Sequence, residues 1–300
     1  MTLTAVLLIV FSVMFHASWN LMTKKSSMTA AFYALLCLTA CMLMSHVWFW
    51  TPVEYSTLPG KFWLTLWCTV ASDCIYGFAL VYAYKKMDMS TAYPAMRSLP
   101  VILTVILTAV MGWGKPLPWT AFAGTLIAFT GCMCIPLRKL TDFNWKFYLS
   151  PQMIAVLLAA CGTTGYTVFD SRSQLAMAEV YPHLNKIVLS MSYYAVRGVC
   201  LSSALTVIVL MIPDLRRDWL GYWKRHDVKP FLGGFAGAAA YLTVLIAMNF
   251  VTNVTYIQLL RLLALPVGVC WGAVFLKEKI TALKIVSVML IIAGIALTIL

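Results

Sequence analysis

Charged residues are scarce in this 300-residue sequence: they make up 11% of it, with 10 Asp and Glu against 22 Lys and Arg. Soluble globular proteins carry about 25% charged residues. Because 62% of the residues are hydrophobic, no aqueous core could bury the excess, and the chain must be solvated by lipid. The net charge of +12 therefore predicts no nucleic-acid partner. Most Lys and Arg lie between apolar runs, where they set topology and anchor the chain at lipid headgroups.

Motifs for catalysis and for metal or nucleotide binding are also missing. The four His are scattered without an HExxH or a His/Cys cluster, and no GxxxxGK[ST] loop occurs. The nine Cys lie in apolar runs without a CxxC pair, so we expect small buried hydrophobes. No basic residue precedes the first apolar run, which argues against a cleaved signal peptide. We therefore expect no enzyme, no metal and no cofactor, and no ATP-driven pump from this chain alone.

Long apolar runs dominate what is present. Each is roughly 20 residues long, the length of one helical crossing, and none alternates apolar and polar residues as a barrel strand would. The sequence thus predicts an all-α polytopic membrane protein with ten transmembrane helices at 3–23, 29–50, 62–84, 91–113, 117–137, 151–170, 187–212, 230–250, 254–276 and 281–300.

The two halves of the chain are weakly similar. A shift of 163 residues places Tyr93 on Tyr256 and Gly131 on Gly294, with Arg97 one position short of Arg261. Five crossings per half make the second copy enter from the opposite face, which gives an inverted-topology repeat of the kind found in secondary transporters. The predicted domains are a first repeat at 1–137, a connecting loop at 138–150 and a second repeat at 151–300.

Lys and Arg in connections and at helix ends are distributed unevenly. Fifteen follow odd-numbered runs, whereas only Lys61, Lys115, Arg172 and Lys186 follow even-numbered ones. By the positive-inside rule the odd connections lie in the cytoplasm. The chain is thus predicted to be a multi-pass protein of the cell membrane, inner or plasma, with both termini outside.

The first apolar run ends in a polar face. His16, Asn20 and Lys24 are spaced i, i+4, i+8, and Trp19 lies beside them. Such a stripe predicts the lining of an aqueous cavity. The alternatives are a snorkelling anchor at Lys24 and an interhelical hydrogen bond at Asn20.

Ionisable residues also occur inside later runs. A charge at the bilayer centre costs about 2.5–3.5 kcal/mol, so each such residue is a candidate functional residue. Asp73 shares a face with Tyr76, and a fixed salt bridge to Arg97 is its alternative role. Tyr166 precedes Asp170, which interfacial solvation at a helix end would also explain. Arg197 stands alone, which favours packing or snorkelling.

Two arginines occupy equivalent places in the halves. Tyr93 and Arg97 are spaced i, i+4 beside Pro94 and Pro100, and the second half offers Tyr256, Gln258 and Arg261. Prolines bend membrane helices, and a broken helix beside a buried arginine is expected at a mid-membrane binding site. Arginine binds carboxylate or phosphate through two parallel hydrogen bonds. The alternative is that each arginine pairs with an aspartate and only fixes helix packing.

The sequence resembles the EamA-type branch of the drug/metabolite transporter superfamily. Besides the ten-helix plan, the similarity rests on three passages: "HASWNLMTK", "ALVYAYKKMDMSTAYPAMRSLPVILT" and "FLKEKITALKIVSVMLIIAGIAL". Glu278 matches an acidic residue common before the last helix, whereas Lys115 departs from that pattern in the first half. Several relatives have cytoplasmic termini, contrary to the charge distribution here. The resemblance implies a central cavity between helices 1, 3, 4, 6, 8 and 9, lined by Trp19, Asn20, Asp73, Tyr76, Tyr93, Arg97, Tyr166, Asp170, Tyr256, Gln258 and Arg261.

The resulting hypothesis is a secondary transporter that moves a small polar or amphipathic metabolite, amino-acid-like or an organic anion, by alternating access. Arg97 and Arg261 would bind an anionic group, Trp19, Tyr93 and Tyr256 would offer aromatic surface, and Asp73 or Asp170 would carry a coupled proton. Two other classes stay open. An intramembrane lipid-modifying enzyme would need a nucleophile–base pair or a metal set, and a membrane scaffold would need no paired intramembrane charges.

Overall fold

The computed structural model describes residues 2–24, 29–87, 89–137, 139–142, 150–276 and 280–299, and these contain helices and no strand. The α-helices are α1 (Leu3–Lys24), α2 (Ala30–Met44), α3 (Gly60–Lys86), α4 (Met89–Met111), α5 (Trp119–Cys134), α7 (Pro151–Val180), α8 (Lys186–Met211), α9 (Pro213–Lys224), α10 (Lys229–Met248), α11 (Thr255–Leu260), α12 (Ala264–Leu276) and α13 (Ala282–Ile299). Short 3-10 turns are η1 (Ser45–Phe49), η2 (Tyr55–Thr57), η3 (Leu140–Asp142) and η4 (Arg261–Leu263).

Seven helices in the described part of the chain are long and apolar enough to cross a membrane: Ala30–Phe49, Gly60–Lys86, Ala92–Met111, Pro151–Val180, Lys186–Met211, Lys229–Met248 and Ala282–Ile299. Three further apolar helices are shorter, at Leu3–His16, Trp119–Cys134 and Thr255–Trp271. Large apolar side chains such as Val110 and Met211, each 77% exposed, cover the outside. The all-helical, multi-pass class of membrane protein is thereby confirmed, while the number of ten crossings stays a prediction.

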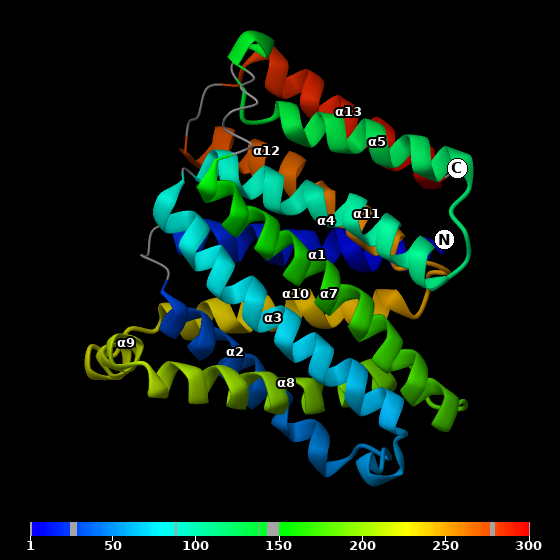
Figure 1. The fold of residues 1–300 in the computed structure, drawn as a ribbon, viewed down its shortest axis with the longest axis vertical. Helices are drawn as coiled ribbons and strands as arrows, with labels where there is room; N and C mark the ends of the chain where they lie inside the picture. The colour runs from blue at the N-terminus through cyan, green and yellow to red at the C-terminus, as the bar shows by residue number, and fades with distance from the viewer. Residues whose placement is uncertain are drawn as a thin grey trace.

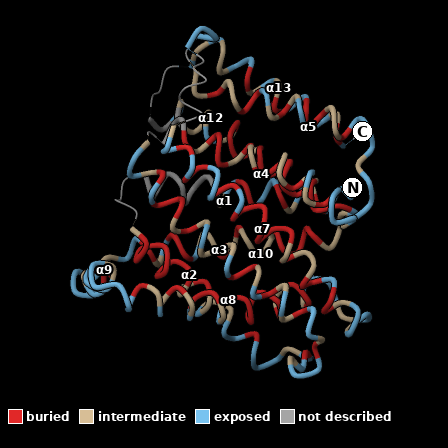
Figure 2. Tube along the Cα trace, viewed as in Figure 1, coloured by how far each residue is buried: buried red, intermediate tan, exposed pale blue. Residues whose placement is uncertain are grey.

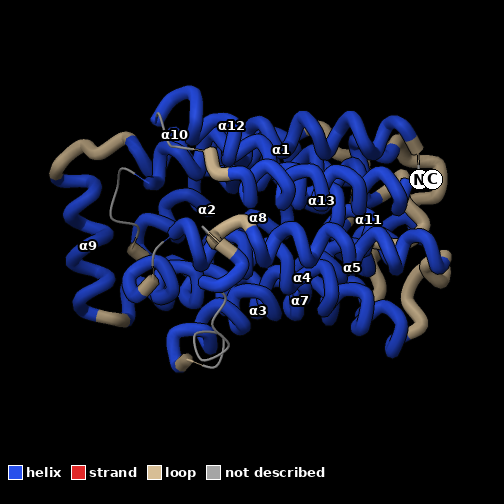
Figure 3. The backbone as a smooth tube through the Cα atoms, turned by 90° about the horizontal axis from the view of Figure 1, so that it is seen from above, coloured by secondary structure: helices blue, strands red, loops and turns tan. Residues whose placement is uncertain are grey.

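The helices pack side by side in a bundle, and most of them run from one end of the bundle to the other (Figure 1). Residues on the inward faces are buried and those on the outer faces are exposed (Figure 2). Helix α3 packs along α7, α1 along α10, and α5 along α13, while α2 lies between α10 and α8. The start of α1 and the end of α13 lie at one end of the bundle, and α9 lies at the other (Figures 1 and 3).

Local sequence explains where helices begin. The Thr29 hydroxyl accepts a hydrogen bond from the Phe32 amide at 3.2 Å, and the Asn185 side chain accepts one from the Ile187 amide at 2.8 Å. Both are helix-capping contacts that satisfy otherwise unpaired amides. Pro151 and Pro213 open α7 and α9 at the first helical position, where proline loses no hydrogen bond.

Two helices differ from the predicted runs. The run predicted at 151–170 continues to Val180, and Ser173 and Gln174 in this extension are buried against neighbouring helices rather than exposed at a membrane edge. The run at 254–276 is not one helix: α11 gives way to η4 at Arg261 before α12 begins. A bent or broken helix was predicted beside Arg97, at Pro94 and Pro100, and not at Arg261. By contrast, α4 continues as a helix through both Pro94 and Pro100.

Candidate functional site

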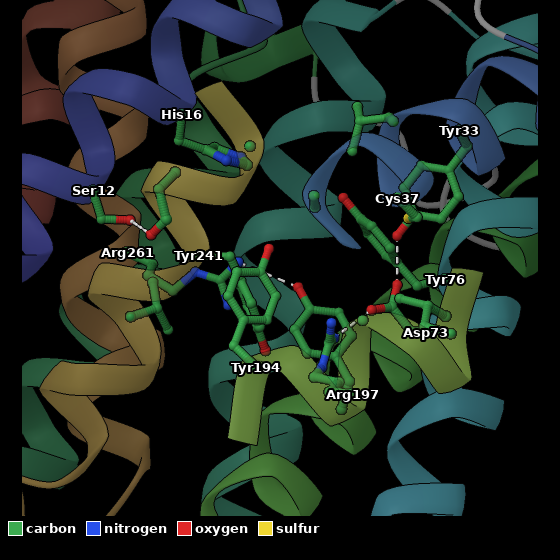
Figure 4. A pocket seen from close by; sticks show the side chains of 18 of the residues that line it. Ser12, His16, Tyr33, Cys37, Asp73, Tyr76, Tyr194, Arg197, Tyr241 and Arg261 are labelled. Carbon is green, nitrogen blue, oxygen red and sulfur yellow. Dashed lines mark hydrogen bonds and ion pairs between the residues drawn. The ribbon is translucent and has the colours of Figure 1, made fainter. Parts of the chain in front are cut away.

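A cavity of about 100 Å³ lies in the middle of the bundle, enclosed by α1, α2, α3, α4, α7, α8, α10, η4 and α12 (Figure 4). The predicted crossings 1, 3, 4, 6, 8 and 9 correspond to α1, α3, α4, α7, α10 and the segment from α11 to α12. The structure adds α2 and α8, the predicted second and seventh crossings, to this lining. Its polar and aromatic lining consists of Ser12, His16, Tyr33, Asp73, Tyr76, Arg97, Tyr166, Tyr194, Arg197, Tyr241 and Arg261. Cavities with a few convergent polar groups are the usual binding sites of proteins.

Arg197 binds two carboxylates at once. From the middle of α8 its Nη2 meets Asp73 Oδ2 on α3 at 2.5 Å, and its Nε meets Asp170 Oδ1 on α7 at 3.1 Å. All three side chains are at most 7% exposed. We call Asp73, Arg197 and Asp170 the charge cluster. Buried charges are tolerated only when they are paired and hydrogen-bonded, and this cluster meets that condition.

Three tyrosines complete the hydrogen bonds of the two carboxylates. Tyr33 on α2 donates to Asp73 Oδ1. Tyr193 on α8 donates to Asp170 Oδ1 at 2.6 Å, and Tyr241 on α10 donates to Asp170 Oδ2. The Tyr241 ring also lies 4.7 Å from the Arg197 guanidinium, a favourable cation–π distance. The charge cluster thus joins α2, α3, α7, α8 and α10.

The other two arginines of the cavity have no acidic partner among the described residues. Arg261 donates to the Tyr166 hydroxyl at 3.2 Å and to Gln258 Oε1 at 3.5 Å. Arg97 lies 5.3 Å from the centre of the Tyr93 ring. Neutral partners leave both positive charges uncompensated inside an apolar bundle, which favours an anion beside them.

Aromatic side chains form a continuous wall of the cavity. The Tyr33 and Tyr76 rings are 6.1 Å apart, Tyr76 and Tyr166 are 5.6 Å apart, and Tyr166 and Tyr241 are 5.7 Å apart, all edge to face. Tyr194 continues this series 6.0 Å from Tyr241. The wall offers apolar surface with hydroxyls at its edges, as an amphipathic ligand requires.

Of the residues predicted for the first helix, only His16 has a described side chain; it lines the cavity near Arg97 and Arg261. The side chains of Trp19, Asn20 and Lys24, together with Glu278, lie outside the described residues. Among the other predictions, the structure gathers Asp73, Tyr76, Arg97, Tyr166 and Arg261 around the cavity.

Four predicted residues lie outside the lining of the central cavity. Tyr93 lines a second, smaller cavity of about 10 Å³ that also touches Tyr76 and Arg97. Gln258 is buried and donates to Thr167 Oγ1 at 2.9 Å. Tyr256 is partly buried outside the lining of the central cavity. Asp170 lies behind Tyr241 rather than on the cavity wall.

Two interpretations of charged residues were wrong. Asp170 does not lie near a helix end, because α7 continues for ten residues beyond it and its side chain is fully buried. Arg197 does not stand alone, and it, not Arg97, is the ion-pair partner of Asp73. A signal for Arg197 was available, since Tyr193 and Arg197 have the same i, i+4 spacing as Tyr93 and Arg97.

Among the described residues, no three His, Cys, Asp or Glu side chains are placed to hold a metal ion. The nine Cys are free thiols, and Cys161 and Cys270 lie exposed on outer faces rather than buried as expected.

No known family model matches the sequence, and no curated protein is significantly similar to it. A solved structure described only as a crystal structure of a protein is similar over 99% of this chain and 96% of its own, with a TM-score of 0.66 and 16% identity. At that identity the similarity shows a shared fold and nothing about function.

Proposed function

We propose that this chain is a secondary transporter that moves a small organic anion, or an amino-acid-like metabolite with an anionic group, by alternating access. One observation carries the proposal: Arg97 and Arg261 face one cavity amid membrane-crossing helices, and neither has an acidic partner among the described residues. Keeping such charges at membrane depth is expensive, and an anionic substrate would offset that cost on binding.

The proposal includes ten crossings in an inverted repeat. Such a repeat would relate α1 to α7, α2 to α8, α3 to α10 and α5 to α13. The observed packing fits this relation: the pair α3 and α7 is matched by the pair α10 and α1. The pairs α5 with α13 and α2 with α8 each join a helix to its own repeat mate. The chain begins and ends at one end of the bundle, as an even number of crossings requires, with the basic helix α9 at the other end. The positive-inside rule then favours external termini, which a C-terminal reporter fusion would test.

Roles follow from position. The two guanidinium groups would bind the substrate carboxylate or phosphate, since arginine can donate two parallel hydrogen bonds to either. Tyr76 and Tyr166 would contact the apolar part of the substrate, and Trp19 and Asn20 remain proposed contacts from α1. The charge cluster would hold the coupled proton, because it contains the two buried aspartates.

Transport by purified protein tests this function. Labelled L-glutamate, L-phenylalanine and succinate would each be offered to proteoliposomes that contain the protein, with Arg97→Ala, Arg261→Ala and the control Arg217→Ala in parallel. Arg217 lies on α9 with an 82% exposed side chain, so its loss should leave uptake unchanged. We expect the wild type to exchange at least one probe and each cavity variant to lose more than about tenfold, as for an interaction of about 1.4 kcal/mol.

The same experiment can contradict the proposal. If the wild type moves none of the three probes, the proposed substrate class fails. If Arg97→Ala and Arg261→Ala both transport as well as Arg217→Ala, the two arginines do not bind the substrate and the assignment of the cavity fails.

A further inference from the structure

We propose that the coupled proton belongs to the Asp73–Arg197–Asp170 cluster as a unit, and that Tyr241 connects this unit to the substrate arginine Arg261. The inference rests on the proposed function and adds to it a coupling device. It assigns roles to Arg197 and Tyr241, neither of which binds substrate directly in the proposal above.

The charge balance of the cluster provides the first step. Two carboxylates share one guanidinium, so the cluster with both aspartates ionised has one more negative than positive charge. One added proton makes it neutral. Carboxylates that share a site titrate as a unit rather than as independent groups, and a single exchangeable proton is therefore the natural capacity of this cluster.

The surroundings of the cluster contribute no further carboxylate within the described residues. The titratable groups that face it are Tyr33 and Cys37 on α2, Cys74 and Tyr76 on α3, Tyr193 and Tyr194 on α8, and Tyr241 on α10. Phenols and thiols donate hydrogen bonds and are neutral in their ordinary form. The two aspartates are thus the groups that accept the proton.

A chain of contacts joins this cluster to the substrate arginine. Arg261 donates to the Tyr166 hydroxyl at 3.2 Å, and the Tyr166 ring meets the Tyr241 ring edge to face at 5.7 Å. Tyr241 in turn donates to Asp170 and covers the Arg197 guanidinium. Figure 4 shows Tyr241 between Arg261 and Arg197. Energetic coupling needs a contiguous physical network of this kind.

The coupled step follows from these contacts. A substrate carboxylate that binds Arg261 competes with the Tyr166 hydroxyl for its N–H groups. Tyr166 and then Tyr241 move, and Asp170 loses the Tyr241 hydrogen bond. Asp170 takes up one proton from water as the substrate binds, and returns it to water on the other side when the substrate leaves. The proton is conserved, and no bond to the substrate forms or breaks.

The test separates exchange from accumulation in proteoliposomes that contain the full chain. Exchange of labelled L-glutamate, L-phenylalanine or succinate, with unlabelled probe inside at equal pH, requires no net proton movement. Accumulation of the same probe under a proton gradient does require net proton movement. Asp170→Asn is the direct variant, but it alters a buried ion pair and can fold poorly. Tyr241→Phe is therefore the decisive variant, because it keeps the ring over Arg197 and removes only the hydroxyl.

Two control variants isolate the connection. Tyr193→Phe also removes a donor from Asp170, but Tyr193 packs on Phe62 rather than in the tyrosine series toward Arg261. It should shift the pH profile of accumulation while coupling persists. Tyr55 does not line the cavity, and its hydroxyl donates to the Ser192 carbonyl oxygen at 2.9 Å. Tyr55→Phe removes this hydroxyl and should change neither assay.

We expect Tyr241→Phe to lower the ratio of gradient-driven accumulation to exchange at least about fivefold relative to wild type. The inference is overturned if Tyr241→Phe accumulates the probe as well as Tyr193→Phe does. It is also overturned if accumulation by the wild type does not depend on the proton gradient. Neither result contradicts the transport proposal. If the wild type exchanges no probe, the proposed function itself fails, and this inference fails with it.

Discussion

Arg197 compensates two carboxylates in the interior of the bundle. A buried ion pair contributes little net stability compared with apolar side chains of the same shape, but removing one partner leaves an unpaired charge. The side chains of the charge cluster are at most 7% exposed, so solvent replaces a missing partner only poorly. The cluster is therefore a constraint on folding as well as a candidate coupling site.

This constraint predicts that Arg197→Met lowers stability by about 3–5 kcal/mol, because both aspartates lose their cation. Thermal unfolding of detergent-purified protein measures the change. Adding Asp73→Asn and Asp170→Asn to Arg197→Met should restore most of the loss, since neutral amides still accept hydrogen bonds from the tyrosines. Arg217→Met, on exposed α9, should change stability by less than about 0.5 kcal/mol. A triple variant no more stable than Arg197→Met would contradict this account.

At the scale of helices, small residues set how closely neighbours approach. A Cβ at Gly162 on α7 would lie 2.6 Å from the Ser72 carbonyl oxygen and 2.7 Å from the Tyr76 amide nitrogen on α3. Small residues at interfaces are the usual means of close helix packing in membranes. Because Asp73 and Tyr76 on α3 and Tyr166 and Asp170 on α7 belong to the site, this approach positions both the cavity wall and the charge cluster.

Gly162→Ala should therefore destabilise the protein by about 1–3 kcal/mol, the usual range for overpacking. Gly268 on α12 is a matched control, because a Cβ there would meet nothing within 4 Å. Gly268→Ala should be neutral or stabilising by up to about 1 kcal/mol, since alanine is the better helix former. Comparison of the unfolding temperatures of the two variants checks this, and equal temperatures would show that α3 and α7 do not need the glycine.

Sequence was informative about helices and less so about partners. Apolar runs predict crossings because a helix that spans the bilayer needs about 20 consecutive, mostly apolar residues, which the sequence shows directly. The end of α7 was missed because the polar residues Ser173 and Gln174 are buried by other helices, which composition does not reveal. The pairing of Asp73 with Arg197 spans 124 residues of sequence, and only the packing of α8 against α3 and α7 brings them together.

For the whole molecule, the account requires one water-accessible, positively charged chamber at the centre of the bundle. The proposed transport requires that this chamber, and not lipid, surrounds Arg97 and Arg261. Cys37 on α2 provides a native reporter, because its side chain lines the same cavity as the arginines.

The most direct test is the rate at which small charged methanethiosulfonates modify Cys37 in liposome-embedded protein, identified by peptide mass spectrometry with Cys37→Ala as the blank. An anionic reagent should react about tenfold faster than a cationic one of the same size, as for charge interactions of roughly 1 kcal/mol or more. Arg97→Gln combined with Arg261→Gln should abolish this preference, whereas Arg217→Gln should not. A Cys37 that neither reagent modifies, or one that prefers the cation, would contradict the central claim.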